Sequence, residues 1–436
     1  MSESSLENKY KNRFDKKLRA EIINPLSAKP RLLASKSVGS IRGPFTARLS
    51  LIVVLIGSSG AFQVFIPSGG GSTFALAPLI IASWLMVTHF MSPTYSRVAN
   101  WLNAAPLVLL CAMPVLSFIW SIDGRKTINV AVVLIIFGIL AMAVSRDLTL
   151  EQRISTASKT LGFLIFVSLV TVVLLPQYGI DHDDRAIAWR GIFLNKNSFG
   201  RVAAIELLFC IFLSMKSTGK ARLGWLTVAA SCSWIMFQSD SQTAFVAATL
   251  ATVATFIVSF SKLKIKFPRI FSLAWLSGYL FVSISIPIVG PIAAQYVSRD
   301  PTLTGRTVLW DLVDEFSNQR PTLGWGFGTV WQTDGGIGNI ISTALTFIPG
   351  SAHNGLLDLR IQIGYIGIVS VMLGLWLIFY RAIKFGSNDG RLPWIIGYAT
   401  LYFVMDLTES TLFFGLTWFL MWILFCPDRA TVRNDL

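Results

Sequence analysis

The sequence predicts an all-α integral membrane protein with about twelve transmembrane helices and two long periplasmic loops. The composition is the first reason: of the 436 residues, 53% are hydrophobic and only 14% are charged, and the mean hydropathy is +0.61. Soluble globular proteins carry about 25% charged residues. The other two reasons are the recurrence of long apolar runs and the distribution of lysine and arginine between them.

Apolar runs recur from residue 47 to the C-terminus. A helix needs about 17 to 25 such residues to cross a bilayer. The expected spans are 47–66, 74–92, 104–120, 127–145, 158–176, 199–215, 221–238, 243–260, 270–290, 355–380, 393–408 and 411–427. Residues 47–436 are therefore expected to form one polytopic domain. We find no internal repeat of the kind from which many transporters are built, which weighs against transport.

The orientation follows from the positive-inside rule. With the N-terminus inside, the cytoplasmic loops carry most of the loop lysines and arginines. The short opposite loops "PSGGGS", "QSDSQ" and "DLTES" carry none, and "SIDGRKT" carries two. Both termini are therefore expected in the cytoplasm.

Residues 1–46 form a basic tail before the first span. They hold ten lysines and arginines, contribute strongly to the net charge of +14, and contain no apolar stretch of a secretory signal. A polybasic segment beside a span is drawn to anionic headgroups. We therefore expect a cytoplasmic tail whose partners are membrane lipids and not nucleic acid.

Metal and disulfide chemistry are not expected. The four cysteines (Cys111, Cys210, Cys232 and Cys426) lie in or beside apolar runs without metal-ligand spacing, which predicts buried free thiols. His182, in the acidic run "DHDD", has a weak likeness to a metal ligand, but a solvated loop is the preferred interpretation. No cofactor is predicted.

Two loops on the outer face are too long to be connectors only. They are expected near 177–198 and 291–354. Structureless loops longer than about 15 residues are uncommon in compact proteins and are often functional. Any chemistry is therefore expected on the outer face.

The second loop contains "LTGRTVLWDLVDEF", residues 303–316, which predicts an amphipathic helix capped by Thr304. Its apolar side is expected against the membrane or the other helices. Arg306 falls in the first turn, where a cation is unfavourable next to the helix dipole. This position invites an anionic partner. The alternative is a surface arginine paired with Asp311 or a phospholipid.

The stretch "GWGFG", residues 324–328, has glycines at alternate positions, which let other groups approach the backbone closely. It lacks the Lys-Ser/Thr that follows in a phosphate-binding loop, so a nucleotide site is not expected. Trp325 can stack on a sugar face, and interfacial anchoring is the alternative.

His353 is one of only three histidines and lies at the mouth of an expected span. Ser351 or Asn354 can cap that span, whose free N–H groups favour an anion. Arg360 lies seven residues on, two helical turns deeper on the same face. Together with Asn354 and Asp358, Arg360 predicts a polar funnel that enters the helix bundle from the outer face. The alternative is a capping histidine above a structural Arg–Asp pair.

The first loop ends in "RGIFLNKNSFGR", where Arg190, Lys196 and Arg201 lie close together with Asn195 and Asn197 between them. Flexible cations at a membrane face suit a phosphorylated lipid headgroup, and arginine adds bidentate contacts.

Three acidic residues, Asp240, Asp406 and Glu409, lie at the outer mouths of other spans. Each is a candidate for a general base or for a partner of the arginines. Ordinary interfacial polarity is the alternative.

Four stretches in this order resemble the O-antigen ligase and Wzy-type polymerase family. They are "RGIFLNKNSFG" (190–200), "TGRTVLW" (304–310), "GWGFG" (324–328) and "HNGLLDLRIQIGYIG" (353–367), and the resemblance covers roughly residues 115 to 370. It implies a metal-independent glycosyltransferase of the bacterial inner membrane. The implied donor is a glycan on undecaprenyl diphosphate, presented on the periplasmic face.

The resemblance also implies roles for individual residues. Arg306 would contact the diphosphate, and His353 would act on the acceptor hydroxyl or help to hold the diphosphate. Arg190 and Lys196 would be further donor contacts, and Asn197 completes this group. Asn354, Arg360 and Trp325 are the remaining substrate-binding candidates.

Two positions depart from the family pattern. Many members have a basic residue where Gln242 stands and an acid where Gln362 stands. If those groups assist catalysis elsewhere, this protein must use others, for example Arg190 or Glu409. Glu409 is therefore counted with His353 and Arg306 among the expected catalytic residues.

The expected function is polymerisation of lipid-linked repeat units into exopolysaccharide or O-antigen, with other polysaccharide export components as further partners. The basic tail resembles exopolysaccharide-production members of the family more than ligases. A ligase that transfers glycan to lipid A core uses the same donor chemistry and stays open. A transporter or flippase of lipid-linked sugars is the alternative from another class, and it predicts paired charges around a central cavity.

Overall fold

The computed structural model describes residues 39–65, 80–81, 83–84, 104–183, 186–261, 265–296, 305–331, 336–345, 348–413 and 415–426. The chain divides into two compact units, residues 1–42 and 43–436. Most of the first unit, and with it most of the predicted tail, lies outside the described residues. Everything below concerns the second unit.

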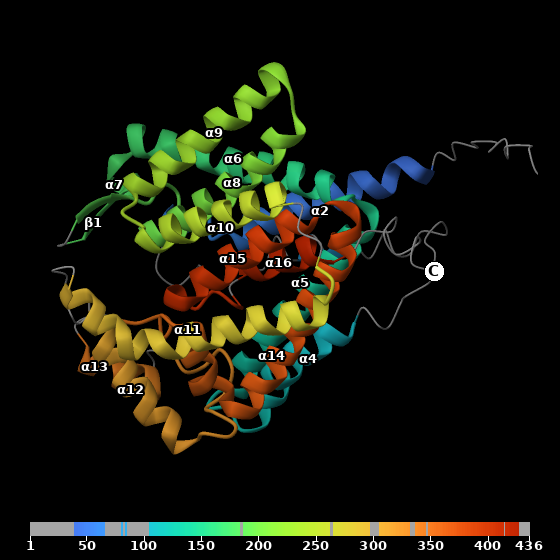
Figure 1. The fold of residues 1–436 in the computed structure, drawn as a ribbon. Coiled ribbons are helices and arrows are strands. Elements are labelled where there is room, and N and C mark those ends of the chain that lie inside the picture. Colours follow the sequence, from blue (N-terminus) through green and yellow to red (C-terminus); the bar gives the residue numbers. More distant parts are fainter. Residues whose placement is uncertain are drawn as a thin grey trace, which may run out of the picture. The chain divides into compact units, whose positions relative to one another are not determined.

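The second unit is almost entirely helical (Figure 1). Its helices are α2 (Gly39–Ser58, which begins in the first unit), α4 (Ala105–Leu116), α5 (Gly124–Asp147), α6 (Leu150–Leu174), α7 (Pro176–Gly179), α8 (Lys196–Lys216), α9 (Gly219–Gln238), α10 (Gln242–Ser261), α11 (Pro268–Tyr296), α12 (Arg306–Gln319), α13 (Ile337–Ala344), α14 (Gly355–Asp389), α15 (Leu392–Glu409) and α16 (Gly415–Phe425). Two 3-10 turns, η1 (Gln63–Phe65) and η3 (Ser117–Ile119), and two strands, β1 (Ile180–Asp183) and β2 (Ala186–Trp189), complete the described elements.

Six of the described helices are long and apolar enough to cross a membrane, namely α5, α6, α8, α10, α11 and α14. Each coincides with a predicted span, which confirms a mostly helical membrane protein. Helices α9 and α15 also coincide with predicted spans, and α2, α4 and α16 contain shorter apolar segments. The predicted span 74–92 lies almost wholly outside the described residues. Twelve spans and the orientation of the termini therefore stay predictions.

The core forms where the most apolar helix is enclosed by others. All ten residues from Leu416 to Phe425 of α16 are buried, including the indoles of Trp418 and Trp422. Helix α10 packs along α15, and α4 packs along α14. A Cβ on Gly397 of α15 would lie 2.0 Å from Oγ1 of Thr255 on α10, so this glycine permits the close approach of those two helices.

The loop predicted near 177–198 is structured. Short helix α7 leads into an antiparallel hairpin of β1 and β2 in which Ile180 pairs with Trp189. Asn195 then accepts a hydrogen bond from the N–H of Ser198 and caps α8. This cap fixes the start of α8 at Lys196.

The loop predicted near 291–354 contains α12 and α13; α12 packs against α14, and α13 packs against α12 (Figure 1). The amphipathic helix is confirmed: the buried Leu309 and Val313 of α12 pack with Ile341 of α13 and Ile361 of α14. The predicted cap, Thr304, lies outside the described residues. The helix begins at Arg306 after Gly305, whose φ of 86° turns the chain without a side-chain cap.

Helix α14 is interrupted at Gly364, where φ is 63° and ψ is −171°. The chain runs along this break from just before "GWGFG" to the first glycines of that stretch. The N–H groups of Trp325 and Gly326 donate to the carbonyls of Ile361 and Gln362, at 3.0 and 2.8 Å. A second segment thus satisfies carbonyls that the broken helix leaves without helical partners.

The glycines of this stretch are required by close contacts, as predicted. A Cβ on Gly324 would lie 2.5 Å from the carbonyl carbon of Gln362, and one on Gly326 would lie 2.2 Å from Oγ of Ser121. Both glycines also have positive φ angles, 69° and 111°. The stretch therefore fixes the second loop to α14.

Candidate functional site

Five polar side chains from four distant parts of the chain meet at the ends of helices. Asn197 and Arg201 lie in the first two turns of α8, Arg306 is the first residue of α12, His353 precedes α14, and Glu409 is the last residue of α15. We call these five residues the outer charged cluster. It brings together four of the predicted site residues, namely Asn197, Arg306, His353 and Glu409.

Glu409 is the centre of the cluster. Its Oε1 accepts a hydrogen bond from Nδ2 of Asn197 at 3.1 Å and one from Nη2 of Arg306 at 3.4 Å. Its Oε2 lies 3.8 Å from Nη2 of Arg201. Of the three interpretations offered for this carboxylate, the structure shows the partner of the arginines. Arg306 accordingly pairs with α15 and not with Asp311 of its own helix.

The cluster combines positive charge with restricted access to water. The side chains of Arg201 and Glu409 are 9% and 10% exposed, and that of Arg306 is 24% exposed. Two guanidinium groups thus share one carboxylate in a partly buried place, where charge interactions are stronger than in water. The first turns of α8 and α12 add the positive ends of their dipoles. This arrangement suits an anionic ligand with several oxygens.

His353 stands beside these charges in a constrained conformation. Its φ of +50° is unusual for a residue with a side chain. Burial and the cation of Arg306 lower the pKa of His353 from 6.5, although Glu409 and a hydrogen bond with the backbone of Thr408 oppose this. The ring is therefore neutral at pH 7, and Nδ1 is buried without a hydrogen-bond partner in the described part of the chain. Such a nitrogen can accept a proton.

Asn354 caps α14, as predicted for this residue or Ser351. Its Oδ1 accepts hydrogen bonds from the N–H groups of Leu356 and Leu357, both at 3.1 Å. Its Nδ2 donates to the carbonyl of Ser283 at 3.0 Å, and the side chain is fully buried. Because these contacts occupy the amide, Asn354 positions His353 and does not face a ligand in this structure.

The side chain of Asp406 contacts the N-terminal end of the same helix, α14. Its carboxylate accepts hydrogen bonds from the Tyr279 hydroxyl at 2.6 Å and from the N–H of Leu412 at 2.7 Å. A Cβ on Gly355 would lie 1.7 Å from Oδ2 of Asp406, so the first residue of α14 rests against this carboxylate. Asp406 therefore positions α14 relative to the last turn of α15.

Arg360 joins two helices. It pairs with Asp314 of α12, and its Nη2 donates to Oδ1 of Asn318 at 2.6 Å. The Arg–Asp pair of the alternative is therefore present, although the cap of α14 is Asn354 and not the histidine. His353 has a left-handed backbone and precedes the cap of α14, so helical spacing does not place it above Arg360.

Asp358, the other residue of the predicted funnel, is engaged within the protein. It accepts hydrogen bonds from Nε1 of Trp331 at 2.8 Å, from the N–H of Ala352 at 2.9 Å and from Nε2 of Gln362 at 2.7 Å. Oε1 of Gln362 accepts from the N–H of Gly328 at 2.7 Å. An amide can both donate and accept in this bridge, which a carboxylate cannot do when it is ionised.

Two predicted donor contacts lie on the hairpin and on α8. Nε of Arg190 donates to the Tyr178 carbonyl at 2.8 Å, and the guanidinium lies 3.5 Å from Asp181, so Arg190 braces the hairpin. Nζ of Lys196 lies 3.1 Å from Asp240, next to Asn197 of the cluster.

Trp325 is held by the second loop. Its Nε1 donates to the Phe316 carbonyl at 2.8 Å, and the guanidinium carbon of Arg320 lies 4.1 Å from the centre of its ring. One face of the indole is therefore occupied by the protein.

Arg201 is the residue that sequence reasoning undervalued. It was noted among the cations near α8 but was not assigned to the site. It lies four residues after Asn197, so both share one face of the helix. That spacing was available in the sequence, whereas the proximity of Glu409 was not.

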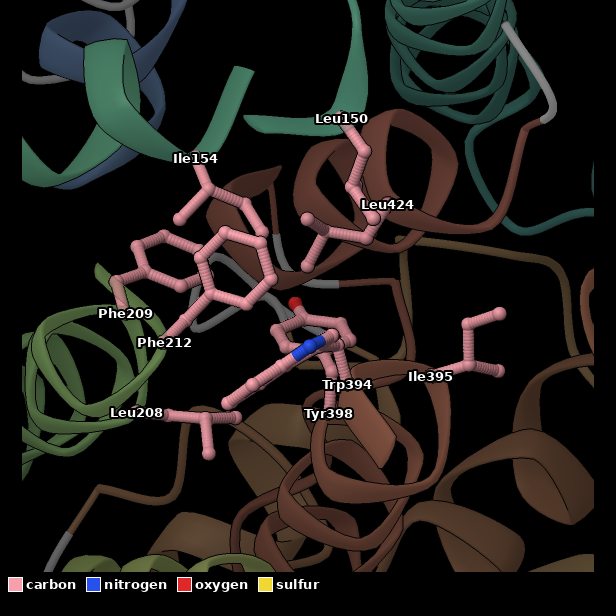
Figure 2. A pocket seen from close by; sticks show the side chains of 9 residues that line it. All are labelled: Leu150, Ile154, Leu208, Phe209, Phe212, Trp394, Ile395, Tyr398 and Leu424. Carbon is pink, nitrogen blue, oxygen red and sulfur yellow. The ribbon is translucent and has the colours of Figure 1, made fainter. Parts of the chain in front are cut away.

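The apolar pocket shown in Figure 2 is not part of this site. Its lining comes from α6, α8, α15 and α16 and consists of Leu150, Ile154, Leu208, Phe209, Phe212, Trp394, Ile395, Tyr398 and Leu424. The Tyr398 hydroxyl donates to the Thr417 carbonyl at 3.2 Å. The pocket offers packing space and no charged group.

Comparison with known proteins gives one distant similarity to report. No protein-family model matches the chain. The exopolysaccharide production protein ExoQ of Rhizobium meliloti (strain 1021) is 23% identical over 313 residues, which cover 67% of this chain and 69% of that protein. This similarity supports a membrane protein family related to exopolysaccharide production.

Proposed function

We propose that the chain is a membrane glycosyltransferase of exopolysaccharide production. It joins undecaprenyl diphosphate-linked repeat units into a longer glycan on the periplasmic face of the bacterial inner membrane. The observation that carries this proposal is the outer charged cluster, in which two arginines and a neutral histidine meet around one carboxylate. The similarity to a protein named for exopolysaccharide production, together with the motif resemblance, supports the same class of reaction.

The reaction assigns a task to each member of the cluster. A hydroxyl of the acceptor sugar attacks the anomeric carbon of the donor, and a new glycosidic C–O bond forms. The C–O bond to the lipid diphosphate breaks, and its electron pair stays on the diphosphate. The hydroxyl proton passes to Nδ1 of His353, a kind of transfer typically worth 10² to 10⁴-fold in rate.

Arg201 and Arg306 stabilise the departing diphosphate. Its negative charge grows in the transition state, and fixed guanidinium groups aimed at that charge need no reorganisation during the reaction. Removing one such donor typically costs about 10² to 10³-fold in rate. Lys196 and Arg190 lie farther out and contact the donor as it approaches.

Glu409 holds the two arginines side by side before the donor binds. Without a carboxylate between them, their charges would repel. The diphosphate then replaces Glu409 as their partner. In this role Glu409 prepares the site, and His353 is the proton acceptor.

Reconstitution with one substrate tests the proposal. Purified protein in liposomes receives an undecaprenyl diphosphate-linked repeat unit as the only glycan, and the products are resolved by size. A ladder of multiples is the expected result. Product that forms only after lipid A core is added would assign a ligase. Movement of the unit across the bilayer without any transfer would assign a transporter and contradict the proposal.

Arg306→Lys separates a site arginine from a surface arginine. Lysine keeps the charge but loses the planar fork that holds two oxygens of a diphosphate. We expect a strong loss of transfer. Arg320→Lys is the control because Arg320 contacts Trp325 and has no described contact with the cluster. Equal activity of both variants would make Arg306 a surface residue.

A further inference from the structure

We propose that a groove between α2 and α6 binds one anionic phospholipid of the membrane leaflet that lies opposite the outer charged cluster. The groove has a volume of about 900 Å³ and is lined by α2 and by the first part of α6. This volume lies within the range of small-ligand sites. Lipid binding does not depend on the proposed function, which only identifies the leaflet as the cytoplasmic one.

Helices α2 and α6 run in the same direction. Helix α6 is followed by α7 and the hairpin, which lead to the start of α8 and so to the outer charged cluster. The chain after α2 reaches the same end of the molecule, because the ring centre of Phe65 lies 5.2 Å from that of Tyr178 in α7. The earlier residues of both helices therefore lie at the opposite end.

The groove changes from charged to apolar along both helices. On α2, its lining residues Arg48, Ile52 and Ile56 are four residues apart and thus share one face. On α6, Lys159 lies one turn before Phe163, where the lining ends. A phospholipid in that leaflet has the same polarity, because its headgroup lies at the membrane surface and its acyl chains point to the bilayer centre.

The polar half of the groove suits a phosphate diester. The side chains of Arg48 and Lys159 form no ion pair or hydrogen bond with the residues that the structure describes, and neither do the hydroxyls of Ser155 and Thr156. Glu151 is the one carboxylate of the lining, so two cations and one anion leave a net charge of +1. A phospholipid with one negative charge balances it. Basic pockets of this kind, between helices at a membrane surface, favour anionic headgroups.

The apolar half of the groove continues as a surface for acyl chains. Phe163, Phe166, Val170 and Val173 lie three or four residues apart on α6, and all four are exposed. Helix α6 is long and apolar enough to cross a membrane, so this stripe faces lipid. A free phosphate would use the cations but not this stripe, whereas a phospholipid uses both.

Photo-capture from vesicles of known composition tests the proposal. The full chain, with Phe163 replaced by p-benzoyl-L-phenylalanine, is reconstituted in equal amounts of phosphatidylglycerol and phosphatidylethanolamine. We expect capture of phosphatidylglycerol to exceed that of phosphatidylethanolamine about fivefold, the factor for one unit charge near the surface. Phe281 of α11, which is 73% exposed, is the control position and should capture both lipids equally. Equal capture of both lipids at Phe163, or capture of another part of the chain there, would overturn the inference.

Charge variants identify the headgroup contacts. Arg48→Gln combined with Lys159→Gln should abolish the preference for phosphatidylglycerol. Lys220→Gln combined with Arg222→Gln is the matched control, because these exposed cations of α9 follow the far end of α8 and lie outside the groove. An unchanged preference in the first pair, or an equal loss in both pairs, would contradict the assignment of the two cations.

Glu151→Gln tests the same site in the opposite direction. It removes the negative charge of the lining, so the preference should rise, by up to about fivefold. This variant keeps the proposal falsifiable if the paired substitutions do not fold, since an unchanged or lower preference would count against it. Inorganic phosphate, compared with chloride at the same ionic strength, should not reduce the capture of phosphatidylglycerol. A reduction would assign a site for free anions and overturn the lipid.

The two proposals can fail separately, because photo-capture uses no glycan. A preference for phosphatidylglycerol at Phe163 in a protein that transfers no lipid-linked glycan would support the lipid site and refute the proposed function. Polymerisation by a protein without that preference would support the function and overturn the inference.

Discussion

Glu409 and His353 depend on the same two arginines, in opposite ways. Glu409 is stabilised by Arg201 and Arg306, whereas protonation of His353 is opposed by them. One pair of cations thus binds a carboxylate and keeps the neighbouring imidazole neutral. A diphosphate in place of Glu409 would also be an anion. The two arginines would then still bind an anion and still oppose protonation of His353.

The pH dependence of transfer follows from His353. Its folded-state pKa lies below the usual 6.5, so the neutral base is present at pH 7 and is lost as the pH falls through that lowered pKa. We expect the acid limb of kcat below pH 6.5, and we expect His353→Ala to fold and transfer nothing. Normal product in His353→Ala would remove this residue from the mechanism.

The same shift affects stability. The unfolded chain takes up a proton near pH 6.5, and the folded chain does so only at lower pH. The contribution of His353 to stability is therefore fully present above about pH 6.5 and declines as the pH falls toward the folded-state pKa.

Glu409→Gln tests the balance of charge at the cluster. The amide removes the charge between two partly buried guanidinium groups, so we expect a loss of about 1 to 3 kcal/mol in unfolding free energy. It also removes a group that raises the pKa of His353, so the acid limb should move to lower pH. Asp240→Asn is the control because the side chain of Asp240, which pairs with Lys196, is 50% exposed. Equal unfolding midpoints and pH profiles in the two variants would contradict the central place of Glu409.

At the scale of elements, α12 carries Arg306 and is fixed to α14 in two ways. Arg360 pairs with Asp314 of α12, and the segment after α12 runs along the break at Gly364. The positions of Arg306 and His353 relative to each other therefore depend on this break.

Gly364→Ala should loosen that connection. The residue has φ of 63°, and an added Cβ would lie 2.4 Å from the carbonyl carbon of Thr322. We expect a loss of about 2 to 4 kcal/mol in unfolding free energy and a higher KM for the lipid-linked donor. Gly278→Ala on α11, where nothing lies within 4 Å of the added Cβ, is the control. Wild-type stability of Gly364→Ala, measured by thermal unfolding in detergent, would show that the break is not required.

Elements were predictable where the sequence signal is local. The long apolar runs located the helices, "LTGRTVLWDLVDEF" located α12, and Asn354 was a candidate cap. The break at Gly364 was not predicted, because apolar residues continue through it and the segment that replaces its helical hydrogen bonds lies about forty residues earlier. The hairpin within 177–198 was missed because each of its strands has only four residues.

At the scale of the whole molecule, the cluster assembles from residues that are far apart in sequence. Six described helices, α9 to α14, lie between Arg201 and Glu409 in the sequence, and no spacing rule links the two residues. The sequence therefore supplied the candidates His353, Arg306, Glu409 and Asn197, while the fold showed that they meet and added Arg201. The sequence did not supply the packing of the helices. That packing brings α15 beside α8, α10 and α14.

The central claim is that this cluster transfers glycan from a lipid diphosphate. It is tested most directly by single-turnover transfer from an undecaprenyl diphosphate-linked repeat unit in liposomes, comparing Arg201→Gln and Arg306→Gln with Arg320→Gln. We predict that each cluster variant loses at least about 10²-fold in rate, that both keep the fold, and that Arg320→Gln stays near the wild-type rate. Rates in Arg201→Gln and Arg306→Gln equal to that of Arg320→Gln would contradict the account.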